Sequence, residues 1–166
     1  MSTGSSTGTA GLVVRTAAVD DPLARPLFDD LAREYGTRYG GTPEQVREEL
    51  LRHPAEEFAA PGGVLLLLLE DGAAVAGGAY RRYDADTAEL KRIWTHPAHR
   101  RRGLARRVLE ELERRAVAAG YHRLFLTTGP RQPEARELYL RTGFRPLFDL
   151  AADPETIGPL PFTKDL

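Results

Sequence analysis

A strand, a loop and a helix followed by a second strand, all between residues 88 and 128, constrain the fold most. Residues 88–95 have strand character, and residues 103–120 carry an amphipathic helical pattern that Gly120 closes. Residues 124–128 again have the composition of a buried strand. A helix that joins two strands in this way is typical of a crossover, so we expect the two strands to be parallel neighbours in one sheet.

The rest of the chain supplies further strands and helices around this unit. Asp71-Gly72, a two-residue hairpin signal, joins the apolar run Val64–Leu69 to a strand at Ala73–Tyr83, where Gly77-Gly78 predicts a bulge or a close approach by another group. The other expected elements are a strand at Leu12–Arg15, a helix from Asp21-Pro22 that Gly36 ends or weakens, helices at Thr42–Leu51 and Pro133–Arg141, and strands at Arg145–Leu150 and Leu160–Thr163. The predicted order is β-α-α-β-β-β-α-β-α-β-β, an α/β fold with a mixed sheet.

The length of 166 residues suits a single domain, which we expect at residues 11–166. Residues 1–10 are small and polar and predict a disordered leader. No segment has the length of a membrane span, and the N-terminus lacks the pattern of a signal peptide, so we expect a cytoplasmic protein with no membrane partner. The chain has no cysteine, which excludes disulfides and thiolate nucleophiles.

The loop Arg100–Ala105 reads R-x-x-G-x-A and opens the crossover helix. Gly103 and the small Ala105 let a ligand approach the backbone, and the first-turn amides have no partners within the helix. Together with the helix dipole and five arginines between residues 100 and 107, these amides predict a site for phosphate or pyrophosphate. Two alternatives remain, a solvated Arg-rich helix start and a nucleic-acid patch. The net charge of −1 argues against the second.

Two side chains near this loop are candidates for proton transfer. Glu89 lies on the preceding strand, where alternation places Glu89, Lys91 and Ile93 on one face. Its carboxylate either acts as a general base, directly or through a water, or faces solvent at a strand edge. Tyr139 shares a helix face with Ala135 and either packs in the core or presents its hydroxyl to the ligand.

Other catalytic groups are scarce. The three serines, Ser2, Ser5 and Ser6, all lie in the leader, so a serine nucleophile is not expected. Of the four histidines, His96 and His99 are close in sequence, and no acidic residue lies between them. We interpret them as solvated loop side chains and expect no metal site.

Residues 88–144 resemble the GNAT N-acetyltransferase superfamily, through the R-x-x-G-x-A loop between two strands and the later motif A-x-x-L-Y-x-x-x-G-F that ends at Phe144. The resemblance implies a GNAT-like three-layer fold and acetyl-CoA as cosubstrate. The pyrophosphate would lie on the amides around Arg101–Ala105, and the pantetheine between the fourth and fifth strands, hydrogen-bonded along Ile93–Thr95. The implied cofactor-binding residues are Ile93, Trp94, Thr95, Arg100, Arg101, Arg102, Gly103, Leu104, Ala105, Arg106 and Gln132.

The resemblance also implies roles for single residues. Tyr139 matches the position that protonates the departing thiolate, and Glu89 matches a frequent base position on the fourth strand. One departure concerns Gln132, because many members carry an asparagine there, three residues before the helical alanine, that contacts the cofactor. Gln132 places a longer amide side chain at this position.

The sequence predicts an N-acetyltransferase that moves an acetyl group from acetyl-CoA to a primary amine of a small molecule or peptide by direct transfer. Attack by an amine on a thioester needs no enzyme nucleophile, in agreement with the side chains present. The alternative is a non-catalytic acyl-CoA-binding module. We expect no nucleic-acid partner, and a homodimer is left open. Residues 17–62 carry ten acids against five arginines, a net charge of −5 that predicts a cationic acceptor or else a solvated helix surface.

Overall fold

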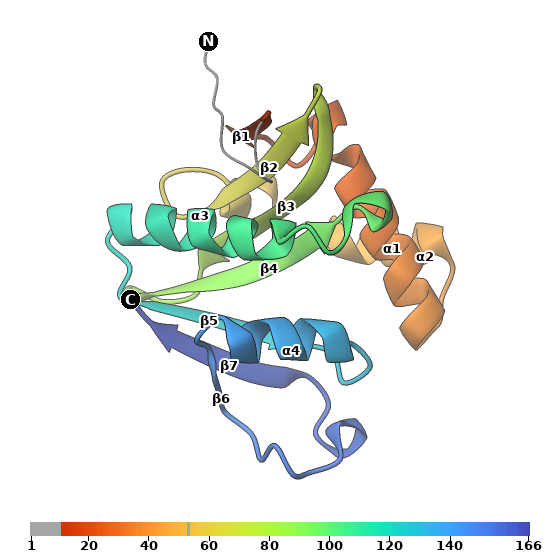
Figure 1. Ribbon diagram of the computed structural model, residues 1–166, viewed down its shortest axis with the longest axis vertical. Helices are drawn as coiled ribbons and strands as arrows, with labels where there is room; N and C mark the ends of the chain where they lie inside the picture. The colour runs from red at the N-terminus through yellow and green to blue at the C-terminus, as the bar shows by residue number, and fades with distance from the viewer. Residues whose placement is uncertain (1–10, 53) are drawn as a thin grey trace.

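The computed structural model describes residues 11–52 and 54–166, and the predicted leader lies outside these residues. The strands and helices follow the predicted order (Figure 1). They are β1 (Leu12–Thr16), α1 (Arg25–Tyr39), α2 (Pro43–Leu50), β2 (Val64–Glu70), β3 (Ala73–Arg82), β4 (Thr87–Thr95), α3 (Leu104–Ala118), β5 (Arg123–Thr128), α4 (Pro133–Arg141), β6 (Arg145–Pro146) and β7 (Leu160–Asp165). Short 3-10 turns are η1 (Pro22–Ala24), η2 (Ala55–Phe58), η3 (Pro97–His99) and η4 (Pro154–Thr156).

The described strands form one mixed sheet in the order β1-β2-β3-β4-β5-β7-β6. As predicted, β4 and β5 are parallel neighbours joined by α3. They pair over Thr87–Glu89 and Arg123–Phe125 and then diverge, which Figure 1 shows as a fork that opens away from the C-terminus. Beyond Glu89, no described strand pairs with β4 on the β5 side, and this open edge forms part of the candidate site.

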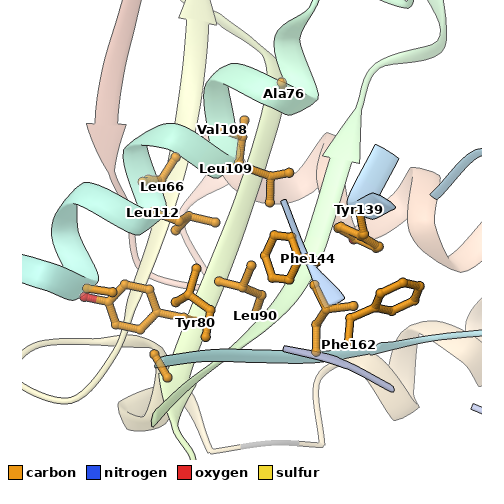
Figure 2. Packing of buried hydrophobic residues seen from close by; sticks show 14 of the residues in the cluster. Leu66, Ala76, Tyr80, Leu90, Val108, Leu109, Leu112, Tyr139, Phe144 and Phe162 are labelled. Atoms are coloured by element: carbon orange, nitrogen blue, oxygen red, sulfur yellow. The ribbon is translucent and has the colours of Figure 1, made fainter. Parts of the chain in front are cut away.

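Helices cover both faces of the sheet. One core cluster packs α3 and α4 against the sheet and includes Leu104, Val108, Leu112 and Tyr139. Figure 2 shows the α3 side chains of this cluster over β2 and β3, with the ring of Tyr139 near Phe144 and Phe162. A second cluster packs α1 and the end of α2 against the opposite face. The α/β three-layer architecture expected from the sequence is confirmed.

The hairpin and the glycine pair of β3 are as predicted. Asp71 and Gly72 have φ angles of 53° and 82° and connect the antiparallel strands β2 and β3. The register of β3 against β4 shifts between Gly77 and Ala79. A Cβ on Gly78 would lie 2.7 Å from Ile93 Cδ1, so this glycine lets β3 and β4 pack closely under α3.

A bulge in β4 makes one prediction wrong. Arg92 has a φ of 62°, and from this residue on the side chains of the strand alternate in the opposite sense between the two faces of the sheet. Leu90 and Ile93 consequently both pack on the α3 side, whereas Trp94 packs on the α1 side. Strict alternation placed Glu89, Lys91 and Ile93 on one face, but the extra residue separates Ile93 from the other two.

Two element boundaries also differ from prediction. Helix α1 passes through Gly36 and ends at Tyr39, and the next residue, Gly40, has a φ of 93°. A Cβ on Gly36 would lie 3.1 Å from the Gly41 carbonyl oxygen, so close packing explains this glycine better than helix termination does. The strand expected at Arg145–Leu150 is limited to Arg145–Pro146. The Leu147 amide still donates to the Pro161 carbonyl at 2.9 Å, but Pro161 has no amide to return a bond, and the ladder ends there. Among the described residues, no helix combines the length and apolarity needed to cross a bilayer.

Candidate active site

The loop before α3 presents free backbone amides to a cavity. Gly103 and Arg101 adopt left-handed conformations, with φ angles of 73° and 66°, and turn the chain into the first residue of the helix, Leu104. No side chain among the described residues caps this helix, so its first amides are available to a ligand. His96 accepts a hydrogen bond from the Ala98 amide at 3.0 Å and so stabilises η3, the turn before the loop.

A cavity of about 620 Å³ lies between this loop, the open edge of β4 and helix α4. Of the eleven predicted cofactor-binding residues, ten line it, the exception being Arg102. The ten are Ile93, Trp94, Thr95, Arg100, Arg101, Gly103, Leu104, Ala105, Arg106 and Gln132. Because β5 has diverged at this level, backbone groups of β4 are accessible for hydrogen bonds to an extended ligand.

Arg102 differs from its neighbours because its side chain is engaged elsewhere. Its guanidinium donates hydrogen bonds to both carboxylate oxygens of Glu70 on β2, at 2.7 and 3.1 Å. These hydrogen bonds lower the pKa of the Glu70 carboxyl. Arg102 therefore ties the loop to the sheet, and it lies outside the cavity that it was predicted to line.

Tyr139 projects from α4 to the place where two cavities meet. Its ring packs against Phe144 and Phe162, with centroid separations of 5.5 and 5.7 Å. Desolvation by burial raises the pKa of Tyr139, so the hydroxyl keeps its proton at neutral pH. Among residues 11–52 and 54–166, the hydroxyl has no hydrogen-bond partner and is available to a ligand.

The second cavity, of about 740 Å³, lies under α1 and α2 and between β4 and β5. It shares four lining residues with the first, namely Ile93, Gln132, Ala135 and Tyr139. Its wall was not predicted from the sequence, because it is assembled from side chains far apart in the chain. These include Tyr35, Tyr39, Lys91, Arg92, Thr127 and Thr128.

Glu89 lies beside this second cavity but does not line it. It is buried, and its carboxylate accepts a hydrogen bond from Arg81 Nε at 2.9 Å. Its other oxygen lies 3.7 Å from Lys91 Nζ. Lys91 does line the cavity, and desolvation lowers its pKa. Glu89 is thus connected to the cavity through Lys91 and does not face it directly.

Gln132 joins the loop before α4 to the end of α1. Its Oε1 accepts hydrogen bonds from the Gly129 amide at 3.1 Å and from the Tyr39 hydroxyl at 3.4 Å. The Tyr39 hydroxyl in turn accepts one from the Arg131 amide at 2.9 Å. Gln132 lines both cavities. Its side-chain carbonyl oxygen, however, is used in hydrogen bonds within the protein.

The charges that line the second cavity have the opposite sign to the one expected. Of the ten acids in residues 17–62, the cavity is lined by Glu49, together with three cations, Arg52, Lys91 and Arg92. Several of the other acids form salt bridges away from the second cavity. Examples are Asp29 with Arg47, Glu34 with Arg100 and Glu57 with Arg81.

The sequence model of the acetyltransferase (GNAT) family matches residues 25–144, from the start of α1 to the end of the A-x-x-L-Y-x-x-x-G-F motif. The chain belongs to the GNAT family. The resemblance stated from the sequence motifs is confirmed. The match includes the candidate cofactor loop, both strands of the fork and Tyr139.

Two GNAT relatives are similar in sequence. One is the uncharacterised N-acetyltransferase YsnE of Bacillus subtilis, 36% identical over 93 residues. That match covers 52% of this chain and 62% of the relative, so the chain spans less than two thirds of that protein. The other is an IAA acetyltransferase of Azospirillum brasilense, 28% identical over 133 residues, which covers 80% of this chain and 82% of the relative.

Among solved structures, the PaiA N-acetyltransferase of Thermoplasma acidophilum, determined in complex with coenzyme A, superposes with a TM-score of 0.72. The two share 16% sequence identity, over 93% of this chain and 99% of that one. At this identity the likeness shows the GNAT fold. The described residues contain no group of three or more histidine, cysteine or acidic side chains arranged to hold a metal, and the metal-free site stays a prediction.

Proposed function

We propose that this protein transfers an acetyl group from acetyl-CoA to a primary amine of a small molecule or peptide by direct attack. The observation that carries this proposal is the meeting of two cavities at Tyr139. One cavity has the amides and arginines that suit a pyrophosphate and a bare strand edge that suits an extended pantetheine. The other offers space for an acceptor whose nitrogen reaches the same point.

The residues of the first cavity fit acetyl-CoA by their chemistry. The amides around Gly103 and the start of α3 would bind the pyrophosphate, with positive charge from Arg100, Arg101 and Arg106. The backbone of β4 from Ile93 to Thr95 would hydrogen-bond the pantetheine, as a missing strand does. This arrangement fixes the thioester beside Tyr139, so binding places the reacting carbonyl.

Tyr139 is proposed to supply the proton that the leaving thiolate needs. In the reaction, a bond forms between the amine nitrogen and the acetyl carbon, the carbon–sulfur bond breaks, and one proton passes from nitrogen while one reaches sulfur. The raised pKa keeps the Tyr139 hydroxyl protonated as the reaction begins. Its hydrogen bond then strengthens as negative charge develops on sulfur.

Glu89 remains a candidate acceptor for the proton of the amine, although its carboxylate does not face the cavity. Because Lys91 lies between the carboxylate and the cavity, the proton would pass through Lys91 or a water. Glu57 gives a matched control, since Glu57 and Glu89 both bind Arg81 at 2.9 Å. Glu89→Gln should slow turnover and flatten the acidic limb of its pH profile. Equal losses in Glu57→Gln would instead assign the effect to the orientation of Arg81.

The alternative, a non-catalytic acyl-CoA-binding module, shares the first cavity and differs in the second. Thermal-shift titration tests cofactor binding, because acetyl-CoA should raise the melting temperature by mass action. Release of free thiol with a panel of primary amines then separates an enzyme from a module. No thiol release with any amine, despite a clear thermal shift, would favour the module. The absence of any shift would contradict both.

Two neighbouring arginines provide a matched control for the cofactor site. Arg106 and Arg107 each face a glutamate one turn later in α3, at 4.0 and 3.5 Å. Arg106 lines the first cavity and Arg107 does not. Arg106→Gln should weaken acetyl-CoA binding by roughly 2- to 10-fold through lost charge, and Arg107→Gln should leave it unchanged. Equal effects would show that the cavity is not the cofactor site.

A further inference from the structure

The second cavity described above, called the acceptor cavity from here on, contains a guanidinium that forms no salt bridge with the described acidic side chains. Arg52 has Glu49 at 3.9 Å, and Lys91 has Glu89 at 3.7 Å. Within residues 11–52 and 54–166, no acidic side chain forms a salt bridge with Arg92. Arg92 is therefore the cation of this cavity that has no salt-bridge partner among the described residues, and Glu89 acts on it only from a longer distance.

The position of Arg92 is fixed by the fold. The bulge in β4 directs this residue toward α2, where its Nη2 donates a hydrogen bond to the Leu50 carbonyl at 2.9 Å. Leu50 is the last residue of α2, so the guanidinium lies at the negative end of that helix dipole. The Cζ atom of Arg92 also lies 5.8 Å from the ring centroid of Phe58. These contacts hold the guanidinium in one orientation.

The hydrogen-bonding capacity of Arg92 is only partly used. A guanidinium carries five N–H donors, and Arg92 Nε is buried without a hydrogen-bond partner in the described structure. A buried donor without a partner costs stability, and a buried charge without one costs more. Arg92 nevertheless lines the cavity, and a carboxylate there would match the planar fork of its guanidinium.

We infer that the acceptor is a small amine that also carries a carboxylate, such as an amino acid with an apolar side chain, and that Arg92 binds this carboxylate. The inference rests on the proposed function and adds the substrate class. Arg92 and Tyr139 line the same cavity, so one small molecule could place its carboxylate at Arg92 and its amine near Tyr139. The apolar lining from Val46, Leu50 and Leu126 suits its side chain.

Matched acceptors test the inference on the unaltered protein. L-phenylalanine, L-phenylalaninamide and 2-phenylethylamine share the side chain and the amine and differ in the carboxylate. L-leucine, its amide and 3-methylbutylamine form a second series. We expect kcat/KM to be roughly 10- to 100-fold higher for the acid than for the other two in at least one series, as for a charge-assisted hydrogen bond. Equal values, or a preference for the amines, would overturn the inference.

Variants connect the preference to Arg92. Arg92→Gln should bring the ratio of acid to amine close to one, chiefly by raising KM for the acid, and Arg92→Lys should restore part of the ratio. Arg15→Gln, on the exposed edge strand β1, should leave the ratio unchanged. Melting temperatures show whether each variant is folded. A ratio that survives in a folded Arg92→Gln protein would contradict the assignment of Arg92.

Binding measurements can test the carboxylate site separately from the proposed transfer reaction. If acetyl-CoA binds and no amine is acetylated, the proposed transfer fails. The substrate class is then decided by titrating N-acetyl-L-phenylalanine and N-(2-phenylethyl)acetamide into the coenzyme A complex. At least 10-fold tighter binding of the acid, lost in Arg92→Gln, would support a carboxylate site. Equal binding of the two compounds would overturn it, whatever the outcome for transfer.

Discussion

Arg102 Nη2 lies 2.7 Å from Glu70 Oε2, and Arg102 Nη1 lies 3.1 Å from Glu70 Oε1. This two-point contact directs the side chain of Arg102 toward β2 and away from the cavity that Arg100, Arg101 and Arg106 line. We therefore expect that Arg102 affects cofactor binding only indirectly, through the shape of the loop.

Arg102→Leu and Glu70→Gln should have the same small effect on acetyl-CoA affinity. Each breaks the same exposed pair, for which we expect less than about a fivefold weakening, and the double variant should be no worse than either single one. Calorimetric titration with acetyl-CoA measures this. If Arg102 bound the pyrophosphate directly, Glu70→Gln would free it and strengthen binding, the reverse of the expected change.

Tyr139→Phe should lower kcat by roughly 10- to 1000-fold and leave acetyl-CoA affinity within about twofold. The hydroxyl is lost while the ring contacts with Phe144 and Phe162 stay, so folding should be preserved. Steady-state kinetics across the pH range, together with melting temperature, measure the change. Wild-type turnover in this variant would leave Tyr139 with a packing role alone.

Stability should fall as the pH rises above about 10, the ordinary pKa of tyrosine. Desolvation raises the pKa of Tyr35, Tyr80, Tyr121 and Tyr139, so the folded protein keeps protons that the unfolded chain releases. Their stabilising contribution is complete below that pH and is lost above it. Lys91 has the opposite effect, because its lowered pKa makes the folded protein release a proton before the unfolded chain does, but it is one group against four tyrosines.

Urea unfolding midpoints between about pH 8 and pH 11 measure this loss. Tyr139→Phe should make the decline shallower, because one of the four tyrosines no longer titrates. Tyr83→Phe is the matched control, since that side chain is exposed, and it should leave the slope unchanged. A midpoint that rises over this range would show that the tyrosines do not govern alkaline stability.

Gly78→Ala should destabilise the protein by about 1–3 kcal/mol, as overpacking of a core does. The added Cβ would lie 2.7 Å from Ile93 Cδ1 and 2.9 Å from Val108 Cγ1, so these two side chains must shift in a packed core. Gly62→Ala is the control, because its Cβ would meet nothing closer than 3.7 Å. Chemical denaturation compares the two, and equal stabilities would show that β3 and α3 pack more loosely than described.

The sequence predicted best what is determined locally. The crossover, its glycine-containing loop and the Asp71-Gly72 hairpin depend on neighbouring residues, and the structure has all three. The bulge at Arg92 depends on pairing between strands, so strict alternation along the sequence missed it. The orientation of Arg102 depends on Glu70, thirty-two positions earlier in the chain, and no local pattern indicates it.

The acceptor cavity was the least predictable part of the site. Its wall combines side chains of α1, α2, β4 and β5 and of the loop before α4, so the net charge of residues 17–62 gave the wrong sign for the cavity. Most of those acids point elsewhere, and the cations come from the end of α2 and from β4. Cytoplasmic localisation, a homodimer and the absence of a nucleic-acid partner stay predictions.

The claim that both substrates are held together, in cavities that meet at Tyr139, is tested most directly by two-substrate initial-rate kinetics. Acetyl-CoA and an accepted amine are varied together while thiol release is followed. Direct transfer predicts intersecting lines in double-reciprocal plots, because the amine attacks while acetyl-CoA is bound. Parallel lines, the pattern of a covalent acetyl-enzyme that forms before the amine binds, would contradict the account.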